Sequence, residues 1–422
     1  MFFVNSIEQK KKNRRKSIEA KITVSKEKPQ IKSFTPNSYG KIYKNGEYEI
    51  EIYSTLAKSL VNTKFTKEIR VDTSMSHFDL YNDPTPPEVS ISLNDFVIEK
   101  VISRSHYGKV MQVRCKKDNK LYAIKTIKKS KLKDEKYVSH IEAERSILQY
   151  IHHPFISSLS YAFQSEKKLY VISSLYKGGD LLFHLNAKGH FDEKTAKFFF
   201  AQIVLLFEYL HSKNIIYRNL SPENIILDND GYIKLCDFTT SKLNISEFSS
   251  GTNTFVGLPE YCSPEMINGY PYGKCVDIWT MGILLFEMLF GETPFNDANR
   301  DKLFKKIIFN EPDFTLNNVE LSYTTIGLLS KMLEKNPEER CDIQFIKKHQ
   351  FMDGVDYDKI YQKIEVCPLK LKKQEENDFD YIDQEMLEEK AEDSIANGCT
   401  PIFKEVFDDF EYDYELEKEQ DW

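Results

Sequence analysis

The feature that most constrains the fold of this chain is a set of short motifs that follow one another in a fixed order. A β-rich segment ends on Lys125, and a helical segment carries Glu144. Further along come Tyr-Arg-Asn-Leu-Ser-Pro-Glu-Asn at residues 217–224, Asp-Phe-Thr at 237–239 and Ser-Pro-Glu at 263–265. Any one of these strings is a weak signal, whereas their shared order and spacing is far more specific.

Length and composition indicate a globular body within a larger chain. The chain has 422 residues, more than one typical domain of ~100–200 residues, so two or three units are expected. Hydrophobic residues make up 41% and charged residues 29% of the chain. This composition supports an ordinary core and excludes a wholly disordered or collagen-like chain.

Charge is distributed unevenly along the chain. Residues 1–92 contain 16 Lys and Arg against 11 Asp and Glu, whereas residues 354–422 contain 8 against 22. The net charge of −7 therefore hides a basic N-terminal segment, a nearly neutral middle and an acidic C-terminal segment. Because the chain as a whole is not basic, we expect no nucleic-acid partner.

The seven cysteines are scattered, and none belongs to a Cys-x-x-Cys pair. We therefore expect neither a disulfide framework nor a zinc site, and reduced thiols fit a cytoplasmic protein. No apolar run approaches the ~18 residues of a membrane span, which favours the same location.

Apolar spacing divides the middle of the chain into a strand-rich part and a helix-rich part. Residues 96–113 and 121–127 are β-rich, and residues 138–150 have the pattern of an amphipathic helix. Helical spacing then recurs in three segments, 196–210, 277–290 and 325–333. Strands followed by helices predict two lobes.

The ordered motifs resemble the signature set of the protein kinases, and finer marks are similar to the AGC group of serine/threonine kinases. These marks are His-Pro-Phe at 153–155, Gly-Gly-Asp at 178–180, Thr-Phe at 254–255, Pro-Glu-Tyr-Cys-Ser-Pro-Glu at 259–265 and the acidic tail. The resemblance implies an α+β, bilobal protein kinase fold with an AGC-type C-terminal tail.

The resemblance also divides the chain into three parts. Residues 96–352 would be the kinase domain, with a small lobe at 96–175 and a large lobe at 176–352. Residues 353–422 would be the acidic tail. Residues 1–92 form a basic N-terminal extension without an assigned module, in which residues 48–53 alternate like a half-exposed strand.

In this family, phosphoryl transfer depends on holding the triphosphate in line and neutralising its charge. The resemblance assigns Lys125 to the α- and β-phosphates of ATP, Glu144 to Lys125, and Asn224 and Asp237 to Mg²⁺. An ordinary strand-to-helix ion pair between Lys125 and Glu144 is the alternative. The remaining nucleotide contacts are assigned to Ile102, Gly108, Val110, Ala123, Ser174, Tyr176, Asp180 and Ile226.

Three departures from the family pattern affect the catalytic loop. Asn219 stands where an aspartate accepts the proton of the substrate hydroxyl, and an amide cannot act as that base. Ser221 replaces a lysine that stabilises the transferred group, and Leu258 replaces a threonine of the same cluster. Loss of a general base costs ~10²–10⁴ in rate, so we expect weak phosphotransfer. The alternative is that a loose transition state needs little base catalysis and a slow kinase persists.

Two further departures concern the loops that hold phosphate and metal. Of the three glycines in the family's G-x-G-x-x-G loop, the first two are Ser103 and Ser105, and only Gly108 remains. Serine adds a Cβ where the backbone approaches phosphate, so nucleotide contact should loosen. Thr239 replaces the glycine after Asp237 and Phe238, and its β-branched side chain should stiffen the metal-binding loop.

Other residues that match the family pattern predict structural contacts and a regulatory phosphosite. Glu265 with Arg340, and Asp277 with Trp279, match structural positions of the family. Thr254 stands at the activation-segment phosphosite for an upstream kinase, with Arg218 and Lys242 placed to pair with the phosphate. An unmodified surface threonine is the alternative.

The tail contains two aromatic segments similar to those of AGC kinases. In the first, residues 378–381, a phenylalanine would lie beside the adenine. In the second, Phe407 and Phe410 would dock on the small lobe, and Glu411 would supply a permanent charge in place of a phosphate. The alternative is an acidic, disordered tail with incidental aromatics.

Three functions remain open from the sequence. The first is an ATP-binding pseudokinase that regulates partner kinases or acts as a scaffold, and the second is a slow kinase of protein serine and threonine residues. The third is a membrane-recruited adaptor whose basic run Lys10–Lys16 binds anionic lipid, for which a solvated arm is the alternative.

Overall fold

The computed structural model describes part of the chain. The described parts are short strands between residues 10 and 71, residues 91–372 except 105–107 and 133–134, residues 375 and 378–392, and residues 407 and 410–414. The chain divides into one unit of residues 1–90 with 414–422 and a second unit of residues 91–413.

In the first unit the described backbone forms antiparallel pairs, β1 with β2, β3 with β6 and β4 with β5. Their bounds are Lys10–Lys12 (β1), Arg15–Ser17 (β2), Ile22–Val24 (β3), Ile42–Asn45 (β4), Tyr48–Glu51 (β5) and Ile69–Val71 (β6). The strand predicted at residues 48–53 is confirmed over β5.

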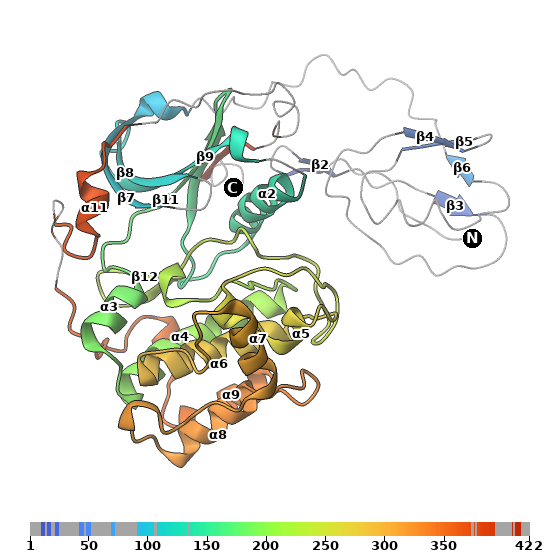
Figure 1. Cartoon of the computed structure of the whole chain (residues 1–422). Coiled ribbons are helices and arrows are strands. Elements are labelled where there is room, and N and C mark those ends of the chain that lie inside the picture. The colour runs from blue at the N-terminus through green and yellow to red at the C-terminus, as the bar shows by residue number, and fades with distance from the viewer. Residues whose placement is uncertain are drawn as a thin grey trace. The chain divides into compact units, whose positions relative to one another are not determined.

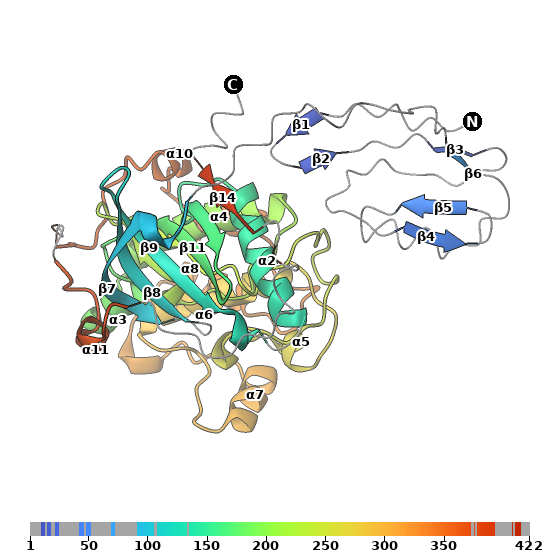
Figure 2. The same cartoon turned by 90° about the horizontal axis from the view of Figure 1, so that it is seen from above.

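The second unit begins with an antiparallel sheet of order β14-β10-β11-β9-β8-β7 (Figures 1 and 2). The strands are Phe96–Arg104 (β7), Lys109–Cys115 (β8), Leu121–Lys128 (β9), Leu159–Gln164 (β10), Lys168–Ser174 (β11) and Tyr412–Asp413 (β14). The helix α2, Glu135–Tyr150, lies beside this sheet. The β14 strand comes from the tail, so the C-terminal segment completes one edge of the sheet.

The register of the sheet decides which side chains face the site. Val110 pairs with Lys125 and Gln112 pairs with Ala123, so these four residues share one face of β8 and β9. The alternate residues, among them Met111 and Ile124, are fully buried on the other face in an apolar core. This core fixes the register, because a slip by one residue would expose the apolar set.

The rest of the second unit is mainly helical, as Figure 1 shows below the sheet. Its longer helices are Leu181–Lys188 (α3), Glu193–Ser212 (α4), Cys275–Phe290 (α6), Arg300–Phe309 (α7) and Tyr323–Met332 (α8). Its shorter helices are Pro264–Ile267 (α5), Ile343–Lys348 (α9), Tyr357–Tyr361 (α10) and Gln384–Glu388 (α11).

Short 3₁₀ turns and one hairpin connect these elements. The turns are Leu93–Asp95 (η1), Lys129–Lys131 (η2), Pro222–Asn224 (η3), Pro259–Tyr261 (η4), Leu316–Asn318 (η5) and Gln350–Met352 (η6). The hairpin is Ile225–Leu227 (β12) with Ile233–Leu235 (β13).

The helices α4 and α6 form the centre of the large apolar core. Within α6, Asp277 is fully buried and holds the segment before the catalytic loop. Its carboxylate accepts the backbone amides of Tyr217 at 3.0 Å and Arg218 at 2.9 Å, and His211 Nε2 lies 2.9 Å away. Asp277 therefore fixes the start of the loop that carries Asn219.

A second buried ionic contact joins α5 to the segment before α9. Arg340 Nη1 and Nη2 donate to the two carboxylate oxygens of Glu265 at 2.7 and 2.9 Å. Arg340 also donates to the backbone carbonyl of Cys275 at 3.0 Å, so the guanidinium is hydrogen-bonded on several sides. Such a bidentate pair combines charge with fixed geometry.

The predicted two-lobed architecture is confirmed. The β-rich residues 96–113 and 121–127 form β7, β8 and β9, and the predicted helices correspond to α2, α4, α6 and α8. Among the described helices, none is long and apolar enough to cross a membrane.

Loss of one partner from the buried Glu265–Arg340 pair should be strongly destabilising. Arg340→Met leaves a buried carboxylate without its partner, which costs about 3–5 kcal/mol and should lower the melting temperature of the second unit by several degrees. The measurement is a thermal melt, with Lys359→Ala as control because Lys359 pairs with Asp356 on the exposed surface. Equal melting temperatures for the two variants would contradict this assignment.

Candidate functional site

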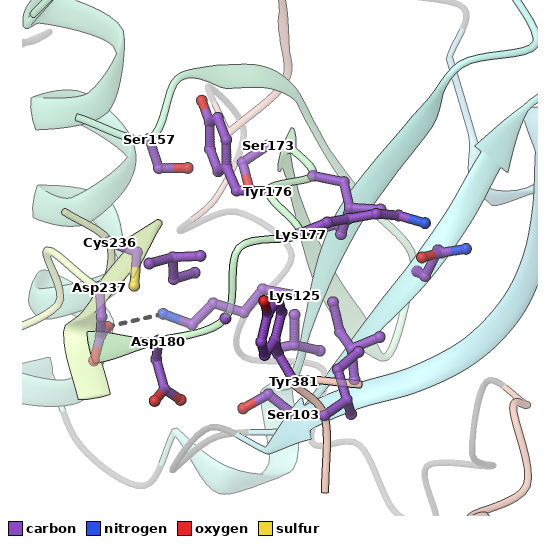
Figure 3. A pocket seen from close by; sticks show the side chains of 18 of the residues that line it. Ser103, Lys125, Ser157, Ser173, Tyr176, Lys177, Asp180, Cys236, Asp237 and Tyr381 are labelled. Atoms are coloured by element: carbon purple, nitrogen blue, oxygen red, sulfur yellow. Dashed lines mark hydrogen bonds and ion pairs between the residues drawn. The ribbon is translucent and has the colours of Figure 1, made fainter. Parts of the chain in front are cut away.

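A cavity of about 450 Å³ lies between the sheet and the helical part of the second unit. Ile102, Val110, Ala123 and Ile226 contribute apolar walls, and the backbone segment 173–177 closes one side. Figure 3 shows Lys125 reaching across the cavity toward Asp237, with Asp180 nearby and Tyr381 at the other end.

Lys125 joins three elements at the base of the cavity. Its Nζ donates to Glu144 Oε1 and Oε2 of α2 at 2.9 and 3.0 Å, and to Asp237 Oδ1 at 3.0 Å. Glu144 also accepts the backbone amide of Phe238, which lies next to Asp237. The strand β9, the helix α2 and the segment after β13 are therefore fixed relative to one another.

The electrostatics of this cluster follow from burial and pairing. Burial opposes the charged form of Lys125, but the charges of Asp237 and Glu144 outweigh it and raise its pKa above the usual range. Burial likewise opposes ionisation of Asp237, yet the charge of Lys125 and the hydrogen bond from Thr239 lower the pKa of Asp237 below its ordinary value. Lys125 and Asp237 are thus held in their charged forms.

The catalytic-loop residues make a network of their own. Asn219 Nδ2 donates to Asp237 Oδ2 at 3.3 Å, and Asn224 Nδ2 donates to the carbonyl of Asn219 at 2.8 Å and to Ser221 Oγ at 3.3 Å. Ser221 is only 1% exposed. Leu258 is 38% exposed, and its side chain has no hydroxyl that could join this network. The network contains no cation at position 221 and no carboxylate at position 219.

The retained glycine at 108 has a packing reason. A Cβ at Gly108 would lie 1.8 Å from the backbone oxygen of Thr126 on β9, so only glycine fits there. Gly108 is not among the described residues that line the cavity. Of the two altered positions, Ser103 lines the cavity and Ser105 lies outside the described residues.

The other predicted nucleotide contacts do line the cavity. They are Ile102, Val110, Ala123, Lys125, Ser174, Tyr176, Asp180 and Ile226. Asp180 also caps the helix α3, because its Oδ1 accepts the backbone amide of Phe183 at 2.7 Å.

The tail covers the open side of the cavity. Phe379 lines it, and the Lys177 ammonium lies 5.5 Å from the centre of the Phe379 ring. Tyr381 packs on the backbone at Gly179, where a Cβ would lie 2.7 Å from that of Tyr381. The tail residues 378–386 therefore supply part of the wall.

These residues fit an adenine nucleotide. A flat base suits the aliphatic walls, and Lys125 is the cation that a phosphate chain requires. Mg²⁺ prefers oxygen ligands, and both Asn224 and Asp237 offer them at the cavity. No group of three or more His, Cys, Asp or Glu in the described parts could hold a metal alone. A cation at this site would therefore need phosphate oxygens in addition to these two side chains.

The predicted switch residues lie close together below the loop. Arg218 Nη1 donates to Tyr272 Oη at 3.0 Å, and Tyr272 in turn donates to the backbone carbonyl of Thr254. Lys242 Nζ donates to Thr252 Oγ1 at 2.9 Å, and this oxygen is 3.4 Å from Thr254 Oγ1. Both cations are therefore near Thr254, whose phosphorylation remains a prediction.

The two tail phenylalanines are buried in the small lobe. Phe407 and Phe410 are 1% and 3% exposed, and their rings meet edge to face with centroids 5.8 Å apart. Gln164 Nε2 donates to the carbonyl of Phe407 at 2.7 Å. Arg145 of α2 donates to the backbone carbonyl of Glu411 at 2.8 Å, so this contact is made by the main chain of Glu411. The tail thus contacts the helix that carries Glu144.

Two contacts could not be anticipated from the sequence. Thr239 Oγ1 donates to Asp237 Oδ1 at 2.5 Å, whereas the sequence indicated only a stiffer loop. Glu389 bridges Arg104 Nη2 at 3.0 Å and Lys109 Nζ at 2.5 Å, which lie before and after residues 105–107 in the sequence. No pattern separates Glu389 from the many other acidic residues of the tail.

Docking of the tail should protect the edge of the sheet. Phe410→Ala removes a buried ring, which costs about 3–5 kcal/mol and should release β14 from β10. Amide hydrogen exchange in β10 and in α2 around Arg145 should then rise. Phe309→Ala, at a phenylalanine that is 77% exposed, is the matched control and should change neither. Unchanged exchange in Phe410→Ala would contradict a docked tail.

Comparison with known proteins gives a consistent picture. Residues 96–352 match the family described as protein kinase domain. The chain is 40% identical to the serine/threonine-protein kinase gad8 of Schizosaccharomyces pombe over 318 residues, which are 75% of this chain and 54% of gad8. It is 36% identical to the RAC family serine/threonine-protein kinase homolog of Dictyostelium discoideum over 343 residues, 80% of this chain and 77% of that protein.

A third relative is the serine/threonine-protein kinase sgk-1 of Caenorhabditis elegans. It is 38% identical over 298 residues, 70% of this chain and 64% of sgk-1. The chain spans about half the length of some relatives, 54% of gad8 and 49% of ypkA of Aspergillus fumigatus.

Proposed function

The chain belongs to the protein kinase family, as an AGC-type homologue of serine/threonine kinases, and from this premise we propose that it binds ATP but transfers phosphate poorly. In this proposal it acts as a regulator or scaffold in phospho-signalling, engaging protein substrates or partner kinases without efficient turnover. The observation that carries the proposal is the Asn219 amide, which donates to Asp237 where the family has a proton acceptor.

The nucleotide side of the site supports binding. Lys125, Glu144 and Asp237 form the contacts described above, and the apolar walls are in place. Bound ATP would supply the transferable phosphoryl group, and Mg²⁺ would neutralise its charge. Lys125 would orient the phosphates, and Glu144 would keep Lys125 in position.

The acceptor side of the site supports impairment. The side-chain amide of Asn219 is not basic at any physiological pH, so it cannot take the proton of a serine or threonine hydroxyl. Ser221 is buried, accepts a hydrogen bond from Asn224, and has no charge with which to stabilise the transferred group.

The expected loss of phosphotransfer rate indicates whether these substitutions impair catalysis strongly or slightly. A general base contributes ~10²–10⁴ in rate, and a preorganised charge-stabilising donor contributes ~10²–10³. These losses are not additive, because the residues act as a unit. Even the smaller loss would place turnover well below that of an ordinary kinase.

A slow kinase of protein serine and threonine residues is the second candidate. It is favoured by the bidentate contact of Lys125 with Glu144, since this ion pair is part of the arrangement that transfer requires. Under this candidate, transfer would depend on Asp237, and Asp237→Ala would abolish it.

The wider assignments belong to the same proposal. They are a basic extension at 1–92, a kinase domain at 96–352, an acidic tail at 353–422, a cytoplasmic location, and control by an upstream kinase at Thr254. Glu411 would supply charge beside α2, and the basic run Lys10–Lys16 would bind anionic membrane in the adaptor alternative.

Restoring the family residues should restore transfer. The variant Asn219→Asp/Ser221→Lys/Leu258→Thr regains a base, a cation and a hydroxyl, so its turnover on basic peptides should rise at least about 100-fold over the unaltered chain. The measurement is transfer of radiolabelled γ-phosphate.

The same triple variant with Asp237→Ala is the control and should be inactive. If the triple variant folds, binds ATP and still shows the rate of the unaltered chain, the loss of activity does not lie in these three residues and the proposal fails.

A further inference from the structure

The carboxylate of Asp237 is already surrounded by side-chain donors. Its Oδ1 accepts from Lys125 Nζ at 3.0 Å and from Thr239 Oγ1 at 2.5 Å, and its Oδ2 accepts from Asn219 Nδ2 at 3.3 Å. An ionised carboxylate accepts at roughly four lone-pair positions. Protein groups therefore occupy most of the positions through which Asp237 would bind a cation.

Two of these donors come from the substituted positions of the site. Ionised aspartate at position 219 could only accept hydrogen bonds, and glycine at position 239 has no side chain. Asn219 and Thr239 thus each bring a donor that the family residue lacks. The structure directs both donors at the same carboxylate, one at each oxygen.

These donors act against metal binding in two ways. Mg²⁺ demands near-octahedral oxygen geometry and gives up its waters reluctantly. To reach Asp237 it must displace the Thr239 hydroxyl or the Asn219 amide. In addition, Asn219 contributes no negative charge, so the site attracts a dication less than one with two carboxylates and repels phosphate less.

We propose that adenine nucleotides bind this site with little help from a divalent cation, because Lys125, Thr239 and Asn219 occupy the Asp237 carboxylate in place of a cation. This inference rests on the proposed nucleotide binding and adds its metal requirement. Asp237 then acts as an anchor for Lys125 more than as a metal ligand.

The test is the affinity of the full chain for ADP, measured by calorimetry with MgCl₂ and with EDTA. We expect the two dissociation constants to agree within about threefold. In Asn219→Asp/Thr239→Gly the family residues return, and the affinity in EDTA should fall at least about tenfold below that in MgCl₂. Thr239→Val keeps the side-chain shape without the hydroxyl and serves as the test if the double variant does not fold. It should raise the ratio of the dissociation constant in EDTA to that in MgCl₂.

Two controls separate metal dependence from damage to the pocket. Adenosine has no phosphate, so its affinity should be the same in MgCl₂ and EDTA for every variant. Thr240→Gly makes the same chemical change one residue further on, at a hydroxyl that faces the carbonyl of Tyr217. It should keep the ratio of the unaltered chain.

The outcomes distinguish the inference from the function on which it rests. ADP binding that requires MgCl₂ in the unaltered chain, with adenosine binding intact, would overturn the inference and leave the proposed nucleotide binding in place. Absence of binding by both ADP and adenosine under both conditions would overturn the two together. Equal ratios in the unaltered chain and in Asn219→Asp/Thr239→Gly would show that these donors do not set the metal requirement.

Discussion

The contact of Lys125 with Glu144 and Asp237 is the interaction on which the arrangement of the candidate site depends. It joins a strand of the sheet, the helix α2 and the segment after β13 through hydrogen bonds of 2.9–3.0 Å. A charged group in such a buried place is stable only when it is paired, so the three elements must meet for the site to exist. The tail strengthens the arrangement, because the backbone of Glu411 binds Arg145 one residue after Glu144.

The site retains charged family residues on its nucleotide side and has lost family residues on its acceptor side. Toward the proposed nucleotide, Lys125 is paired with Glu144 and Asp237, and apolar residues line the cavity. Toward the acceptor hydroxyl, three family residues are replaced. The amide Asn219 stands in place of the base, the buried Ser221 in place of the cation, and Leu258, which is 38% exposed, in place of the threonine. Asn219 and Thr239 both donate hydrogen bonds to Asp237, and in our proposal these substituted residues help to hold the Asp237 carboxylate in position.

Much of the fold and the cavity could be predicted from the sequence, because widely separated motifs can share this order only in one architecture. The lining residues followed from the same motifs, whereas the reason for Gly108 did not. Its constraint is the carbonyl of Thr126, which becomes visible only when β8 and β9 are paired. The Thr239 hydroxyl was missed because a rotamer, and not a residue type, directs it at Asp237. Glu389 was missed because Arg104, one of its partners, lies 285 residues away in the sequence.

The central claim is that a chain that binds ATP transfers phosphate poorly. Single-turnover transfer from pre-bound radiolabelled ATP to a basic peptide tests it most directly, with bound ATP measured in the same sample. The account predicts stoichiometric ATP binding and a transfer rate at least about 100-fold below the ~1–100 s⁻¹ of ordinary kinases. A rate within that ordinary range would contradict it.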